Sequence, residues 1–83
     1  MRLVMVYREA SEYRMSTESF MRDFKYRTGR EIESINPDTR EGAEFCKIYD
    51  IVQYPTLVAV APDGTPAETW AGDLPTISEA SGY

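Results

Sequence analysis

Few side chains of this sequence are able to do covalent chemistry. Its 83 residues include one cysteine, Cys46, and no histidine. A serine hydroxyl needs a neighbouring base to act as a nucleophile, so the absence of histidine argues against a serine-based catalytic site. A reactive thiol needs exposure and nearby positive charge, and Lys47 is a weak sign of either. Because free cysteine is among the most buried residue types, we expect Cys46 to pack in the core.

Carboxylates gather in the middle of the chain, at Asp38, Glu41, Glu44 and Asp50. Their spacing matches no calcium loop, and a transition-metal site would need histidine or paired cysteine. We interpret them as the solvated face of a helix. The sequence therefore predicts no metal site and indicates no cofactor.

Length and composition predict one small globular domain over residues 1–83, with 42% hydrophobic and 28% charged residues. A net charge of −5 argues against nucleic-acid binding, which needs a surplus of Lys and Arg. No apolar run is long enough for a membrane span or a signal peptide, so we expect a cytoplasmic protein without membrane contact.

The charge is unevenly distributed along the chain. Residues 1–30 carry seven basic and four acidic side chains, whereas residues 31–83 carry two basic and ten acidic ones. The basic group at Arg22, Lys25, Arg27 and Arg30 suits the C-terminal end of a helix. The alternative is a pair of oppositely charged faces that guides an acidic partner or a second copy.

Hydrophobic patterning predicts six elements in the order β-α-β-α-β-β. A continuous apolar run indicates a buried central strand, and Thr28-Gly29 is typical of a helix end. Ser16 to Ser19 offer N-caps for the first helix, which could begin as early as Ser11. Pro66 favours an edge position for the last strand. The expected elements are Leu3–Tyr7, a helix to about residue 28, Glu31–Ile35, a helix from Asp38 or Thr39 to Tyr49, Leu57–Ala61 and Ala67–Ala71.

The most informative stretch is Tyr54-Pro55-Thr56, which opens an apolar run. Proline lacks an N–H and belongs at the start of a strand rather than inside one. With Tyr49-Asp50-Ile51 before it and Gly72 after it, this stretch resembles the Tyr-x-Ile-x-x-hydrophobic-Pro-Thr segment of thioredoxin-like domains. The resemblance implies an α/β fold with a mixed four-stranded sheet, two main helices and a cis peptide bond at Tyr54-Pro55. The core would span 2–72, and the tail 73–83 would be a shortened closing segment.

The same resemblance implies that dithiol chemistry is missing. The two positions of the family's Cys-x-x-Cys pair fall at Ser11 and Arg14, within Ser11-Glu12-Tyr13-Arg14. Neither residue can exchange disulfides, so we expect no enzyme of that kind. Ser11 is then an N-cap or an ordinary loop residue.

The family's proline loop presents a backbone edge to client peptides, and this function needs no cysteine. We therefore expect a protein- or peptide-binding module whose partner could also be a second copy. Tyr7 could line the groove or pack in the core, and Trp70 could be a core or an interface residue. The expected binding residues are Ser11, Tyr13, Arg14, Tyr54, Pro55 and Thr56.

Two other hypotheses stay open. In one, the chain is a monothiol redox or glutathione-handling protein that uses Cys46. In the other, it is a self-associating structural subunit in which a second copy covers the sheet face left by the short tail, or the edge at Pro66. In the tail itself, Leu74 and Ile77 either lie across the sheet face in one helical turn or leave it open to a partner.

Overall fold

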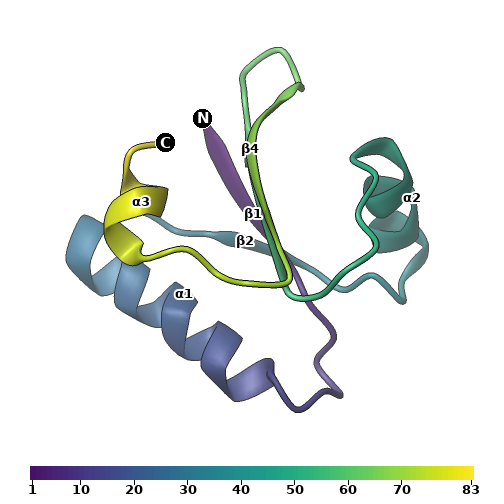
Figure 1. Ribbon diagram of the computed structural model, residues 1–83, viewed down its shortest axis with the longest axis horizontal. Helices are drawn as coiled ribbons and strands as arrows, with labels where there is room; N and C mark the ends of the chain where they lie inside the picture. Colours follow the sequence, from purple (N-terminus) through teal and green to yellow (C-terminus); the bar gives the residue numbers. More distant parts are fainter.

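A four-stranded sheet in the order β2-β1-β3-β4 organises the fold. The computed structural model describes residues 1–83. Strand β1 is parallel to β2 and antiparallel to β3, and β4 pairs antiparallel with β3 at the edge. Helices α1 and α3 cover one face of the sheet and α2 covers the other (Figure 1). The elements are β1 Arg2–Val6, α1 Arg14–Thr28, β2 Glu33–Ile35, α2 Arg40–Ile48, β3 Thr56–Val60, β4 Pro66–Ala71 and α3 Ile77–Ser81.

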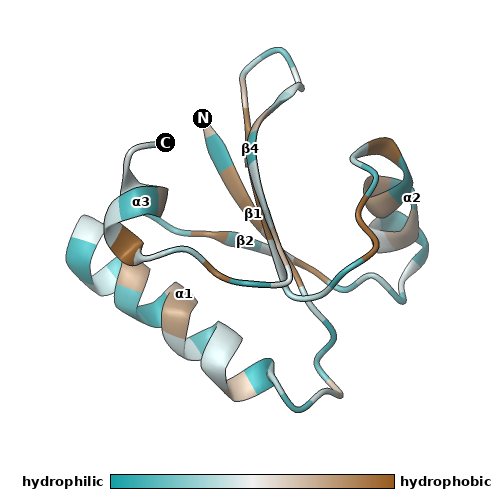
Figure 2. Ribbon diagram, in the orientation of Figure 1, coloured by the Kyte–Doolittle hydropathy of each residue, from teal (hydrophilic) through white to brown (hydrophobic).

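The expected mixed sheet and the edge position of β4 are confirmed. Strands β1 and β3 lie at the centre because both are apolar over nearly their whole length. Figure 2 shows β1 brown beyond its first residues. Successive side chains of a strand point to opposite faces, so each strand contributes residues to two cores, one on each side of the sheet. Leu3, Met5 and Leu57 pack with Phe24 of α1 on one side. Residues of the opposite parity pack with Cys46 of α2 on the other, namely Val4, Val6, Val58 and Val60.

Helix α1 begins earlier than the Ser16 to Ser19 caps predicted, and its first residue is Arg14. The residue before it, Tyr13, makes no side-chain cap. The hydroxyls of Ser16 and Thr17 donate instead to the Tyr13 carbonyl, at 2.9 and 2.8 Å, so they lie inside the first turn. The end is as expected, because Gly29 takes the left-handed conformation that terminates the helix, with φ 74°.

Strand β2 is shorter than the expected Glu31–Ile35 and contains only Glu33–Ile35. The isoleucines of the expected range pack on opposite faces of the sheet, Ile32 on the α1 side and Ile35 on the α2 side. The two isoleucines are three positions apart, which places them on opposite faces of an extended chain.

The tail covers the sheet rather than leaving it open. Thr76 and Glu79 form a reciprocal capping box that starts α3. Leu74 and Ile77 pack against the α1-side core, and Ala80 is completely buried there. None of the three helices is long and apolar enough to cross a membrane.

Helix α2 starts at the predicted cap, Thr39, whose hydroxyl accepts the Gly42 N–H at 3.0 Å. Gly42 is buried in the first turn against the backbone of Asn36 and Pro37. A Cβ at this position would lie far inside the contact distance of the Asn36 carbonyl oxygen. This close approach sets how near α2 lies to the end of β2.

We expect Gly42→Ala to destabilise the protein by about 2 to 3 kcal/mol because backbone must move to make room. In an open helix the same change would stabilise by up to about 1 kcal/mol. Gly82→Ala is the matched control, since its Cβ would lie at 3.4 Å from the Glu79 carbonyl oxygen. Urea unfolding of both variants measures the difference, and equal stabilities would contradict the packing described.

Candidate functional site

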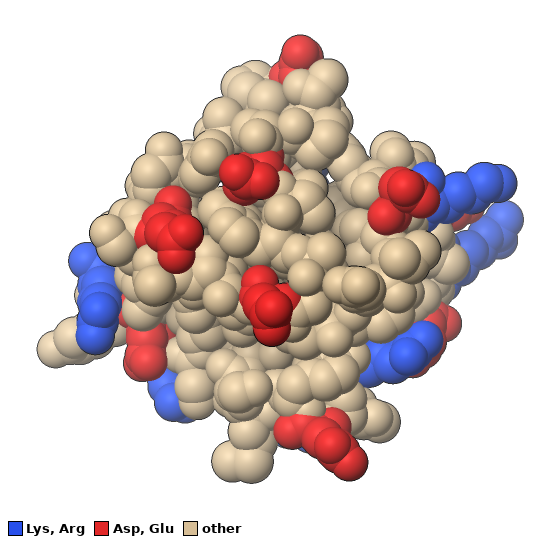
Figure 3. All heavy atoms as spheres, in the orientation of Figure 1, with Lys and Arg blue, Asp and Glu red and all other residues tan.

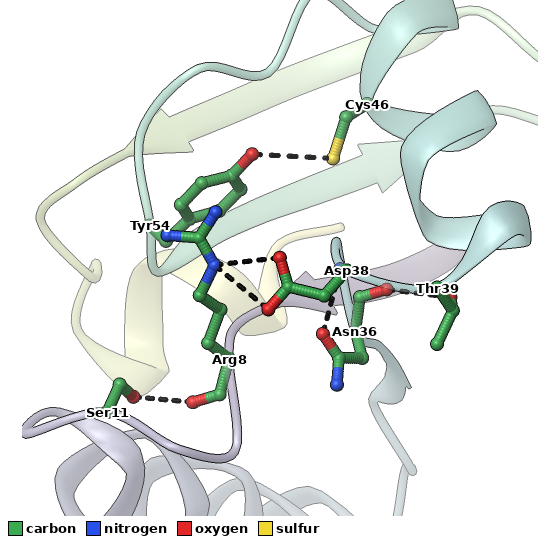
Figure 4. Close-up of polar contacts among 7 residues, drawn as sticks. All are labelled: Arg8, Ser11, Asn36, Asp38, Thr39, Cys46 and Tyr54. Carbon is green, nitrogen blue, oxygen red and sulfur yellow. Dashed lines mark hydrogen bonds and ion pairs between the residues drawn. The ribbon is translucent and has the colours of Figure 1, made fainter.

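The ends of three strands meet at one edge of the sheet. Because Val6 of β1 lies opposite both Ile35 of β2 and Thr56 of β3, the residues after β1 and β2 adjoin those before β3. This brings together Arg8, Asp38 and Tyr54 (Figure 4). The edge contains most of the residues that the sequence predicts for binding.

Arg8 is the centre of this arrangement. Its guanidinium carbon lies 4.8 Å from the centroid of the Tyr54 ring, and its Nε is 3.1 Å from each carboxylate oxygen of Asp38. The hydrogen bond and the charge of Asp38 raise the pKa of Arg8 above its ordinary value. Both side chains are about half exposed, so the pair orients Arg8 over Tyr54 more than it stabilises the fold.

Tyr54 lies between Arg8 and the single cysteine. Its hydroxyl donates to Cys46 Sγ at 4.0 Å, and its ring packs against the α2-side core. Burial, followed by this hydrogen bond, raises the pKa of Tyr54. Cys46 is 8% exposed and belongs to the core, as expected.

The segment that leads into α1, residues 11–14, contributes less than expected. The Ser11 hydroxyl donates to the Arg8 carbonyl and caps no helix N–H, so Ser11 fixes the loop rather than the helix. Tyr13 packs on the α1-side core. Arg14 forms an ion pair with Glu18 at 3.4 Å. Of these three residues, Ser11 alone has a hydrogen bond to Arg8.

Tyr7 packs in the core and does not line a groove. It is 6% exposed, and its hydroxyl donates to Glu18 Oε2 at 2.9 Å. Burial and then this hydrogen bond raise the pKa of Tyr7 to about 12. The one cavity of the chain, about 300 Å³, lies at the opposite end of the sheet and is lined by Met1, Arg2, Val60, Ala61, Pro62 and Gly64.

The loop before β3 has the expected backbone form, with a cis peptide bond between Tyr54 and Pro55. Pro55 and Thr56 are buried, and the Thr56 hydroxyl donates to the Gln53 carbonyl. The Pro55 carbonyl accepts the Gly72 N–H at 3.0 Å. By contrast, the N–H and carbonyl of Tyr54 have no hydrogen-bond partner in the chain.

Sequence reasoning missed Arg8 and treated Asp38 only as part of a solvated helix face. A signal was present, because both residues closely follow predicted parallel strands. The carboxyl ends of parallel strands meet at one sheet edge, so polar residues there are neighbours. No three metal-binding side chains cluster anywhere in the chain.

One solved structure shows the relationship of this architecture to known proteins. Thioredoxin 1 from the thermophilic eubacterium Thermosipho africanus superposes with a TM-score of 0.71, covering 96% of this chain and 85% of its own. The fold is thioredoxin-like. The two sequences share 14% identity, a level at which the likeness shows the fold alone. No family model and no curated protein sequence matches the chain. In this thioredoxin-like fold, Ser11 lies three residues before α1 and Arg14 is the first residue of the helix.

Ionisation of Tyr7 makes folding sensitive to alkaline pH. Its folded-state pKa of about 12 lies above the ordinary value of 10.0, so the unfolded chain ionises first. The contribution of Tyr7 to the free energy of unfolding is therefore fully present below pH 10 and decreases as the pH rises towards 12. We expect Tyr7→Phe to show a shallower loss of stability over this range. Tyr26→Phe, at a site 90% exposed, is the control and should match the wild type.

The rate at which the Cys46 thiol is alkylated tests whether Tyr54 restricts access to it. We expect slow alkylation of the native thiol, because Cys46 is buried and the Tyr54 hydroxyl lies 4.0 Å from its sulfur. Tyr54→Ala should raise the rate at least about tenfold by local opening, whereas Tyr13→Ala should not. Unfolding curves of both variants exclude a global effect. Fast alkylation of the wild type would instead favour the monothiol hypothesis.

Proposed function

We propose that this chain is a protein- or peptide-binding domain without dithiol redox chemistry, and that it binds an extended segment at the loop before Pro55. The observation that supports this most directly is the unpaired backbone of Tyr54, beside the paired carbonyl of Pro55. An extended peptide can pair with such groups as an added strand. Main-chain hydrogen bonds then supply the affinity and neighbouring side chains the selectivity.

The side chains around this loop suit such a role. Val52 is 79% exposed two residues before Tyr54, so both can flank a bound backbone. Arg8, which is paired with Asp38, lies over the Tyr54 ring and limits its movement. A loop that is already fixed loses little conformational entropy on binding, which favours affinity.

The absence of dithiol chemistry rests on the residues themselves. Ser11 and Arg14 occupy the positions that the resemblance assigns to the cysteine pair, and the one thiol is buried on the α2 side. Disulfide exchange proceeds by attack of a thiolate on a sulfur, so a serine and an arginine cannot perform it.

Selection of displayed peptides on the wild-type chain provides a probe for binding. For a selected peptide, N-methylation at every second amide should abolish binding, and methylation of the intervening amides should have little effect, because only alternate amides face the added edge. Arg8→Gln should weaken binding several-fold by releasing Tyr54, and Arg22→Gln on α1 is the matched control. The proposal fails if no peptide discriminates between these variants or if methylation has no alternating effect.

The redox half of the proposal is tested separately by insulin reduction with dithiothreitol. We expect no acceleration over the reductant alone, and the Cys46→Ser variant should behave identically. Catalytic turnover by the wild type would overturn this half.

A further inference from the structure

The outer edge of β4 carries backbone groups that no other strand uses. Strand β4 ends the sheet, and its only strand partner is β3. The Thr69 N–H is bonded to the carboxylate of its neighbour Glu68 at 3.0 Å, and therefore points away from β3. The Gly72 N–H points the other way, to the Pro55 carbonyl.

These two bonds fix the direction of the strand's remaining groups. N–H groups of successive residues face opposite sides of a strand, so those of Glu68 and Trp70, like that of Gly72, face β3. The N–H and carbonyl of Thr69 and Ala71 then face solvent. Both residues are exposed, and the bulge near Ala59 and Pro66 ends this regular stretch on its other side. An added strand has a short, well-defined edge to pair with.

Acidic side chains surround this edge. Residues 48–83 contain five Asp and Glu and no Lys or Arg. None of the four salt bridges of the chain includes any of these acids. Figure 3 shows this face, with carboxylates over its surface and Lys and Arg at its margins. The exposed acids on β4 and in the segments next to it in the chain are Asp63, Glu68 and Asp73.

We propose that β4 accepts a basic extended segment of another protein as a fifth strand. Side chains of this segment that lie beside Glu68 and Trp70 share the α1-side face of the sheet and would be Lys or Arg at alternate positions. Glu68 exchanges its bond to the Thr69 N–H for the partner's cation, which frees that N–H for the new backbone. The Trp70 ring, half-buried against Tyr83 at 5.4 Å between centroids, offers a second cation a π face.

A second copy of this chain fits the same edge poorly. Two β4 strands brought together would place two copies of the 48–83 stretch, which contains five Asp and Glu and no Lys or Arg, against each other. Charged residues on an edge strand are a common protection against such self-pairing. Glu68 therefore excludes identical chains while it attracts a basic segment.

The probe for this proposal is a capped peptide of alternating lysine and threonine, titrated into the isotopically labelled full chain. Binding should protect the Thr69 and Ala71 amides from hydrogen exchange and change the fluorescence of Trp70, the only tryptophan. Glu68→Gln should weaken binding about 2- to 5-fold. The matched control, Glu44→Gln on the exposed side of α2, should not change it. Affinity should fall as salt is added.

A second peptide separates strand addition from simple charge attraction. Proline in place of threonine keeps the charge but removes the N–H groups, so its binding should be lost. Equal binding of both peptides, or protection confined to Val52 and Tyr54, would overturn the proposal. A second result would also overturn it. If sedimentation shows that the free chain is a dimer and that Glu68→Lys disrupts this dimer, the edge is occupied by a second copy.

Discussion

The pairing of β1 with β3 is the constraint on which the rest of the structure depends. Its register, with Val6 opposite Thr56, places the loop after β1 beside the loop before β3. Both strands are apolar on both faces, so each face of the sheet must be covered. Helices α1 and α3 cover one face and α2 the other. In a chain of 83 residues, these two cores account for most of the apolar side chains that can be buried. The candidate site lies where the loops that connect the sheet to these helices meet.

Features with a local cause were predictable from the sequence, and those with a tertiary cause were not. Thr39 as a cap, Gly29 as a helix end and the edge position of β4 each follow from the chemistry of one or two residues. The start of α1, Arg14, lies between the two predicted limits, Ser11 and the Ser16 to Ser19 caps. The caps themselves were wrong because Ser16 and Thr17 have a second option, a bond back to the Tyr13 carbonyl, that pattern alone does not weigh. The pairing of Arg8 with Asp38 spans 30 positions and becomes visible only when β1 and β2 are aligned.

The candidate site is already occupied by the chain's own side chains. Arg8 lies over Tyr54, the Tyr54 hydroxyl contacts the Cys46 sulfur, and Tyr7 and Tyr13 belong to the α1-side core. No cavity opens at this edge, since the one cavity lies at the other end of the sheet. The edge therefore offers a partner backbone groups rather than a pocket. Because surface ion pairs stabilise little, a partner that displaces Asp38 from Arg8 loses little in doing so.

The two free backbone edges differ in their electrostatic setting, and this difference separates what each can bind. The loop before Pro55 has Arg8 and Asp38 beside it, a balanced pair that favours neither sign of charge. The edge of β4 belongs to a stretch of 36 residues, 48–83, that contains no Lys or Arg. Charge acts over roughly 8 to 10 Å at physiological salt, far enough to bias which segment reaches β4 but not to hold it. Holding then falls to the Thr69 and Ala71 backbone, so charge selects the partner and hydrogen bonds fix its register.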